Sequence, residues 1–251
     1  MDDLYMCDLD FSTRYSDFDC FDRLKISSAL DFMQEGAGIS ANQLGCGSNY
    51  LWPKGWGFIV TNNYLELYRP VKTSEKLHLK TWPLPPRHII FERHYELFAE
   101  DGGKVAAAVS RWCLLDLKNK KILPASALTE QDYARYNPKK AMDFKIWKIP
   151  PVSLAGDSPA FIMRVYGSEC DHYMHVNNTR YADFCMNCFP AEYLKDHAVT
   201  SFQISYEEQC LAGDELSFYR IPTGEEAFLI VGVKNENTQF MRAKITFSAQ
   251  S

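Results

Sequence analysis

The sequence predicts an α+β fold built from two tandem repeats, each a long helix packed on an antiparallel sheet. Three observations lead to this prediction. A loop, a helix and a run of strands occur twice along the 251 residues, the apolar positions of the two runs share one spacing, and a proline- and lysine-rich stretch separates them. We place the repeats at residues 1–125 and 158–251 and a linker at 126–157. With 46% hydrophobic residues, the chain can bury a sizeable core.

The first repeat opens with a loop from Tyr15 that leads into a helix from Ile26. Apolar residues such as Ala29, Phe32 and Met33 recur at helical spacing, which predicts a largely buried helix. The strands that follow are predicted from apolar runs bounded by turn residues. We place them at 56–60, 64–68, 75–82, 89–100 and 104–117.

The second repeat has the same order of elements. A loop from Tyr166 leads into a helix that we expect to begin at Asn177 and to stop before Pro190. Its strands are predicted at 201–210, 214–220, 227–234 and 239–248. Leucines 65, 67, 77 and 79 of the first repeat have the same spacing as Ile204, Tyr206, Leu216 and Phe218. This register without a gap indicates an internal duplication.

The stretch between the repeats is a linker by composition. Phe144, Ile146 and Trp147 indicate that it packs against a repeat rather than hanging free. Lysines gather in it and beside it, at Lys118, Lys120, Lys121, Lys139 and Lys140. They form a candidate docking edge for an acidic partner, although a solvated linker explains them equally well.

Charge and hydropathy narrow the range of functions. A formal net charge of −5 argues against nucleic acid as a partner, because phosphate binding relies on a basic face. The first residues lack the basic start and the apolar run of a secretory signal. No stretch approaches the ~18 apolar residues of a membrane span. We therefore expect a cytoplasmic protein with no membrane insertion.

The eight cysteines are expected to be buried thiols rather than a disulfide framework. Cys185 and Cys188 have the spacing of metal ligands, but a zinc site needs two further ligands and no second pair supplies them. Packing cysteines are the better interpretation. We expect neither a metal nor an organic cofactor.

The segment from Asp171 to Tyr181, DHYMHVNNTRY, resembles the Asp-x-Asn-x-His-Val-Asn-Asn segment of plant and bacterial acyl-ACP thioesterases. Similarity to that family extends over nearly the whole chain, through the first loop and helix, the central strands and residues 204–210. The resemblance implies a double hot-dog fold, with two tandem hot-dog repeats. It also implies hydrolysis of the thioester of fatty acyl-ACP, with acyl carrier protein as the partner. A homodimer is left open.

Thioester hydrolysis needs a group that stabilises an oxyanion and a base that activates water or a nucleophile. A helix beginning at Asn177 and Asn178 would offer backbone N–H groups to a developing oxyanion. His175 suits proton transfer, and Asp171 could orient it or act as the base itself. Isolated Asp and His residues beside a helix cap are also common as ordinary loop-ordering residues.

The chain departs from the family pattern at two positions. Tyr173 stands where the family has Asn, and Gln209 stands where it has a Glu that precedes the retained Cys210. Gln209 cannot act as a base. Because side chains alternate along a strand, Glu207 is expected to face the same side as Gln209 and is a candidate replacement carboxylate, although a solvated Glu is equally expected.

Two further functions stay open. An acyl-CoA thioesterase is an alternative because CoA and acyl carrier protein share the phosphopantetheine arm. A non-catalytic acyl-binding or carrier-binding protein is another, given Tyr173 and Gln209. The resemblance implies that the N-terminal repeat supplies an apolar tunnel for the acyl chain. Its candidate lining residues are Phe32, Met33, Trp56 and Trp82, each of which could equally be ordinary core.

Overall fold

The computed structural model describes residues 4–128, 136–235 and 238–250. The remaining parts of the expected repeats and linker, residues 1–3, 129–135, 236–237 and 251, lie outside the described residues. The elements of the N-terminal half are β1 (Cys7–Ser12), α1 (Ile26–Gln43), α2 (Ser48–Leu51), β2 (Trp56–Leu67), β3 (Lys76–Pro83), β4 (Phe91–Ala99), β5 (Lys104–Asp116) and β6 (Lys121–Leu123). Those of the C-terminal half are β7 (Phe161–Arg164), α3 (Arg180–Met186), α4 (Ala191–Asp196), β8 (His197–Tyr206), β9 (Glu215–Pro222), β10 (Ala227–Lys234) and β11 (Thr238–Ala249).

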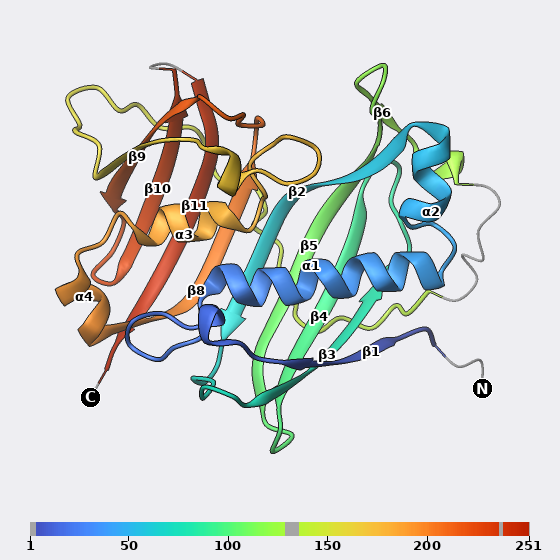
Figure 1. The fold of residues 1–251 in the computed structure, drawn as a ribbon, viewed down its shortest axis with the longest axis horizontal. Helices are drawn as coiled ribbons and strands as arrows, with labels where there is room; N and C mark the ends of the chain where they lie inside the picture. Colours follow the sequence, from blue (N-terminus) through green and yellow to red (C-terminus); the bar gives the residue numbers. More distant parts are fainter. Residues whose placement is uncertain (1–3, 129–135, 236–237, 251) are drawn as a thin grey trace.

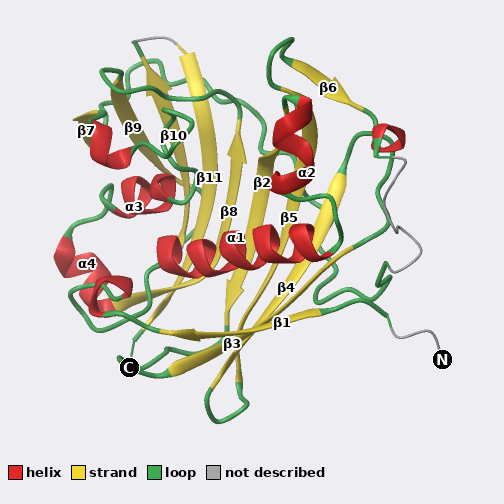
Figure 2. Cartoon of the chain, turned by 45° about the vertical axis from the view of Figure 1, so that its right-hand side comes forward, coloured by secondary structure: helices red, strands yellow, loops and turns green. Residues whose placement is uncertain are grey.

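The described strands form one sheet in the order β1-β3-β4-β5-β2-β8-β11-β10-β9-β7, with β6 beside β5. Neighbouring strands are antiparallel. Helices α1 and α3 lie on the same face of this sheet, α1 over the N-terminal half and α3 over the C-terminal half (Figure 1, Figure 2). The predicted α+β architecture of antiparallel sheet and covering helices is confirmed.

Three elements predicted from the sequence have clearly different bounds in the structure. The expected strands at 56–60 and 64–68 are one strand, β2, because a register shift between Val60 and Asn62 keeps its pairing with β5 continuous. The second helix, α3, begins at Arg180 and has only 7 residues, whereas a long helix from Asn177 was expected. Strand β8 stops at Tyr206 rather than at residue 210.

Local sequence explains where α1 begins and ends. Its apolar residues face the sheet, and Ala29, Leu30, Phe32 and Met33 are all buried there. The helix ends at Gln43, and Gly45 follows with a φ of 70°. Such a left-handed glycine commonly terminates a helix, since a side chain would be strained there.

The two halves meet along one pair of strands. Residues 62–66 of β2 pair with residues 201–205 of β8 in register, which makes a single sheet out of two. Leu65, Phe202 and Ile204 are fully buried at this seam. They belong to one hydrophobic core that runs beneath both helices.

The loops that precede α1 and α3 have matching backbones. An isolated bridge joins Phe18 to Leu24 in the first loop, and another joins Cys170 to Val176 in the second. Asp22 and Met174 occupy equivalent places in these loops, and both have positive φ values, 59° and 66°. The internal duplication inferred from the sequence thus extends to the conformation of the loops.

Residues 144–152 of the linker lie on the face of the sheet opposite the helices, whereas Leu128 packs with Leu51 of α2. The Phe144 ring stacks on Tyr64 of β2 with ring centroids 3.8 Å apart. Gln203 of β8 donates a hydrogen bond to the Ile146 carbonyl at 2.8 Å, and Arg242 of β11 donates one to the Ile149 carbonyl at 2.9 Å. The linker therefore packs as expected, although the Ile146 side chain itself is 68% exposed.

Candidate active site

The loop before α3 holds Asp171 and His175 close together in the backbone. The Asp171 N–H donates to the His175 carbonyl at 2.8 Å, so the two residues close one tight turn. The Asp171 Oδ1 accepts the Tyr173 N–H, also at 2.8 Å. Met174 at the tip has a φ of 66°, a conformation that costs free energy in a residue with a side chain. Strained turns of this kind are frequent at functional sites.

The segment after β8 supports this turn. His175 forms a β-bridge with Leu211, and the Val176 N–H donates to the Cys210 carbonyl at 2.9 Å. Among the described residues, no side-chain hydrogen bond joins Asp171 to His175, and the His175 imidazole has no hydrogen-bond partner. Both side chains are half-buried, so water can reach them.

The start of α3 supplies one free backbone donor. The Asn177 N–H is already bonded to the Glu169 carbonyl at 3.0 Å, and the Asn177 side chain accepts the Thr179 N–H at 3.2 Å. The Asn178 N–H has no hydrogen-bond acceptor among the described residues. The Asn178 side chain donates to Gln34 Oε1 of α1 at 2.6 Å, which fixes the turn against the N-terminal half.

Tyr173 crosses from the C-terminal half to the N-terminal half. Its hydroxyl accepts a hydrogen bond from Trp52 Nε1 at 2.7 Å, and the two rings meet edge to face. His172 packs on Tyr173 with ring centroids 3.9 Å apart. Trp52 lies in the 3₁₀ turn after α2. No sequence pattern predicted its contact with Tyr173, because only the packing of the two halves brings them together.

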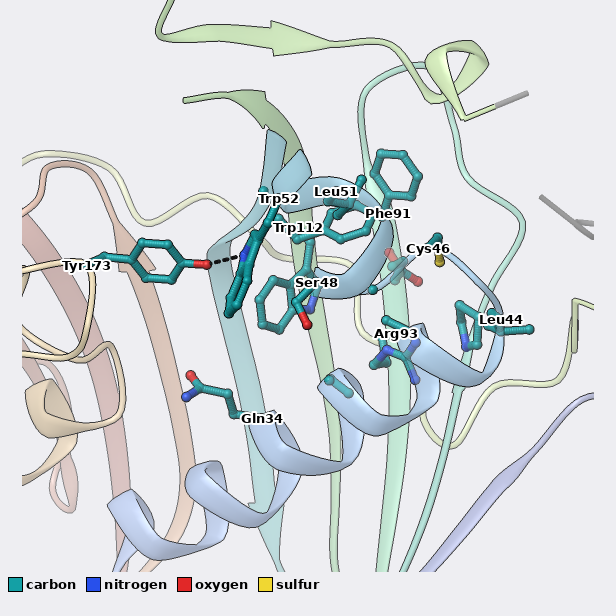
Figure 3. A pocket seen from close by; sticks show the side chains of 18 of the residues that line it. Gln34, Leu44, Cys46, Ser48, Leu51, Trp52, Phe91, Arg93, Trp112 and Tyr173 are labelled. Atoms are coloured by element: carbon teal, nitrogen blue, oxygen red, sulfur yellow. Dashed lines mark hydrogen bonds between the residues drawn. The ribbon is translucent and has the colours of Figure 1, made fainter. Parts of the chain in front are cut away.

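A cavity of about 310 Å³ opens beside this contact, between α1, α2 and strands β2, β4 and β5. Most of its lining is apolar, including Ala37, Ala41, Leu51, Phe58, Phe91 and Trp112. His172 and Tyr173 complete the lining, and the Gln34 side chain projects from α1 on the same side of the cavity as Tyr173 (Figure 3). An apolar cavity of the N-terminal half thus meets the polar turn of the C-terminal half.

The predicted tunnel residues lie outside this lining. Phe32 and Met33 are buried in the main core, and Trp82 belongs to a separate cluster near the linker. Trp56 packs with Leu51 and Phe58 behind the cavity. All four are therefore ordinary core, the alternative stated for them, because the next turn of α1, from Ala37 to Ala41, faces the cavity instead.

Among the described residues, no hydrogen bond joins the side chain of Glu207 or Gln209 to the turn. Strand alternation does not extend to residues 207–209, because the ladder ends where the N–H groups of Glu207 and Glu208 both point at the Phe240 carbonyl. The Glu207 carboxylate pairs with Arg242 at 2.5 Å, on the linker face of the sheet. Gln209 is exposed, and its carbonyl accepts a hydrogen bond from Lys234 at 2.8 Å.

Six of the eight cysteines are buried free thiols as expected, whereas Cys170 is half-buried and Cys20 is exposed. Burial raises the pKa of Cys210 to about 11, despite an opposing hydrogen bond from Tyr181. Burial likewise raises the pKa of Cys188 to about 12 and that of Cys185 well above its usual range. No group of three or more His, Cys, Asp or Glu residues in the described ranges is arranged to hold a metal ion.

The lysines proposed as one docking edge form two separate groups. Lys121 of β6 lies opposite Asp116 in the strand register, at the end of β5. The Lys139 carbonyl accepts a hydrogen bond from Trp82 of β3. Trp82 is opposite His94 of β4, and His94 is in turn opposite Val109 of β5. Seven residues of extended strand, about 23 Å, separate Asp116 from Val109. The two groups therefore lie apart, because the linker returns to the sheet near the middle of β5, and docking of an acidic partner on them stays a prediction.

Two hot-dog halves that share one sheet and one core, with one turn facing one apolar cavity, define a double hot-dog protein. The acyl-ACP thioesterase N-terminal domain model matches residues 5–130, and the C-terminal domain model matches residues 158–249. The chain belongs to the acyl-ACP thioesterase family. A search of curated proteins found no match.

Solved structures agree with this fold over the full chain. An acyl-ACP thioesterase from Bacteroides thetaiotaomicron superimposes with a TM-score of 0.87 at 22% identity, covering 97% of this chain and 98% of that one. A 12:0-ACP thioesterase from Umbellularia californica gives a TM-score of 0.85 at 14% identity, covering 98% of each chain. In the described residues, no helix has the length and apolar character needed to cross a membrane.

Proposed function

We propose that this chain hydrolyses the thioester of fatty acyl-ACP in the cytoplasm and releases a free fatty acid and holo-ACP. The observation that carries the proposal is the junction of the apolar cavity with the turn that holds Asp171 and His175. An acyl chain in the cavity would bring its thioester to that turn. A mostly apolar pocket with a few convergent polar groups is the usual form of a small-molecule site.

The chemistry can be assigned to the residues of the turn. The imidazole of His175, or the carboxylate of Asp171, takes a proton from a water molecule as the water oxygen attacks the thioester carbonyl carbon. The Asn178 N–H is a donor available to the resulting oxyanion. When the C–S bond breaks, the phosphopantetheine thiolate takes up the proton. The fatty acid and the holo-carrier are then free to leave.

Cys210 has no nucleophilic role in this scheme. Its raised pKa of about 11 keeps the sulfur protonated near neutral pH, and the thiol is the poor nucleophile of the two forms. Glu207 is likewise assigned to its ion pair with Arg242 rather than to catalysis. Water activation is left to Asp171 and His175.

The test is turnover of purified protein on saturated acyl chains from hexanoyl to stearoyl, each carried on acyl carrier protein and on CoA. Release of holo-carrier is measured by mass spectrometry, and release of CoA by a thiol reagent. We expect hydrolysis with a higher kcat/KM on the protein carrier. Preference for CoA would make the chain an acyl-CoA thioesterase. Binding of acyl-ACP without turnover would make it a non-catalytic carrier-binding protein.

A further inference from the structure

Arg93 is a buried cation that faces the cavity and has no counterion in the part of the chain that the structure describes. Arg93 of β4 lines the cavity and is 8% exposed. Its Nη1 donates to Ser40 Oγ at 2.8 Å and to Thr81 Oγ1 at 3.2 Å. Both partners are neutral hydroxyls. Among the described residues, the Arg93 Nε and Nη2 have no hydrogen-bond acceptor, and the guanidinium has no carboxylate partner.

The nearest acidic residue in sequence is already engaged. Glu92 lies 3.2 Å from Arg111 Nε and 3.4 Å from His94 Nε2. Burial alone would raise the pKa of Glu92, but the nearby His94 and the hydrogen bond from Arg111 hold it below its usual range. Arg111 also packs on Trp147 of the linker, on the sheet face away from α1. Glu92 also lines the cavity, but its carboxylate is engaged by Arg111 and His94 and forms no ion pair with Arg93.

Arg93 lies deep in the cavity relative to the candidate catalytic turn. Gln34 of α1 contacts Asn178 beside that turn, whereas Arg93 contacts Ser40, six residues later on the same helix. At 1.5 Å per residue, these two points are about 9 Å apart along α1. In Figure 3, Tyr173 and Arg93 lie on opposite sides of the cavity. An acyl chain of moderate length, bound with its thioester at the turn, would reach the guanidinium.

We infer that the cavity selects acyl chains that carry an oxygen function, a hydroxyl, oxo or carboxylate group, at a distance from the thioester, and that Arg93 donates hydrogen bonds to this oxygen. This inference rests on the proposed function. A buried guanidinium with two unused donors is costly beside a plain hydrocarbon chain, and an oxygen acceptor from the ligand removes that cost. Arg93 is thus a specificity-determining residue rather than a catalytic one.

The experiment compares octanoyl, decanoyl and dodecanoyl chains on acyl carrier protein, each plain, with a terminal hydroxyl and with a terminal carboxylate. The quantity measured is the ratio of kcat/KM for the oxygenated chain to that for the plain chain. In the wild type, we expect this ratio to exceed one for at least one length. Arg93→Met should lower that ratio about ten- to a hundredfold, mainly by slowing the oxygenated substrate. Arg93→Lys should restore part of it.

Ser40→Ala is the matched control, since it removes a partner of Arg93 but keeps the guanidinium in the cavity. It should lower stability and leave the ratio unchanged. If the wild type prefers plain chains and Arg93→Met slows all chains equally, the role of Arg93 is only to join α1 to the sheet. That result would overturn the inference and leave the proposed function intact. If the wild type hydrolyses no chain, calorimetry with the free hydroxy acid and its plain counterpart decides. Equal affinity for the two would also overturn the inference.

Discussion

His175 has a counterpart in the N-terminal half that cannot act as a base. In the first loop, Asp19 accepts the Phe21 N–H as Asp171 accepts the Tyr173 N–H, but Arg23 stands where the second loop has His175. The Arg23 guanidinium donates to the carbonyls of residues 194 and 197, so it joins the halves. The duplication therefore leaves one candidate acid–base turn in the chain.

At the residue scale, the first prediction concerns the two members of that turn. Asp171→Asn and His175→Ala should each lower kcat on acyl-ACP by something on the order of a hundredfold, because general acid–base groups act mainly in the transition state. KM should change little. Glu207→Gln serves as the control and should keep nearly full kcat, since Arg242 already pairs with that carboxylate. A large loss of kcat in this control would restore Glu207 to the mechanism.

Cys210 gives a second prediction at this scale. Since the folded pKa of about 11 exceeds the ordinary value of 9.0, the folded protein holds the thiol proton more tightly than the unfolded chain. This contribution to stability is full below about pH 9 and is lost as pH rises toward the folded pKa. Cys210→Ala should flatten the fall in unfolding free energy over that window and leave kcat nearly unchanged. If iodoacetamide inactivates the enzyme at neutral pH by modifying Cys210, the prediction that this thiol is protonated and takes no part in catalysis is contradicted.

At the element scale, α1 approaches β3 at one glycine and stays clear of it at another. A Cβ on Gly36 would collide with the fully buried Leu79 side chain, whereas a Cβ on Gly38 would meet nothing within 4 Å. The helix can lie this close to the sheet because position 36 has no side chain. The spacing between α1 and the sheet also sets the depth of the cavity.

This pair of glycines gives a third prediction. Gly36→Ala should destabilise the fold by about 1–3 kcal/mol through overpacking. Gly38→Ala should stabilise it by about 0.5–1 kcal/mol, because alanine loses less backbone entropy in a helix. Chemical denaturation of both variants measures the difference. Equal effects of the two substitutions would show that α1 does not approach β3 closely at residue 36.

Sequence patterns predicted some elements well and missed others for identifiable reasons. Strand β10 has the predicted bounds, because its apolar run is continuous and both ends carry turn residues. β1 was missed although its Cys7, Leu9 and Phe11 alternate with polar residues, since a short edge strand carries a weak signal. The turn of Asp171 and His175 was located from its motif. Arg93, Gln34 and Trp52 were not assigned to the site, because only tertiary packing brings them to the cavity.

For the whole molecule, the seam between β2 and β8 couples the two halves. Each half alone would expose an unpaired strand edge at this seam, together with the buried Leu65, Phe202 and Ile204. The residues beneath it belong to a core shared by both helices. Neither half can lose its structure without uncovering the other.

The fourth prediction follows from that coupling. All 5 tryptophans lie between residues 52 and 147, so tryptophan fluorescence reports mainly on the N-terminal half and the linker. Far-UV circular dichroism reports on both halves. In urea, the two signals should change at one midpoint, as expected for a single cooperative transition. Two separate midpoints would show that the C-terminal half unfolds independently.

On the face of the sheet opposite the helices, the linker contacts strands from both halves and so helps to hold the two halves together. Phe144 stacks on β2, and the carbonyls of residues 146, 149 and 152 accept hydrogen bonds from β8 and β11. Lys145 stands out from it with 78% of its side chain exposed. Trypsin cleavage at Lys145 should therefore give two bands on a denaturing gel but one peak in gel filtration, with thioesterase activity retained. Two separate peaks after this cut would mean that the halves stay together because the chain is continuous, and not because of the contacts between the linker and the sheet.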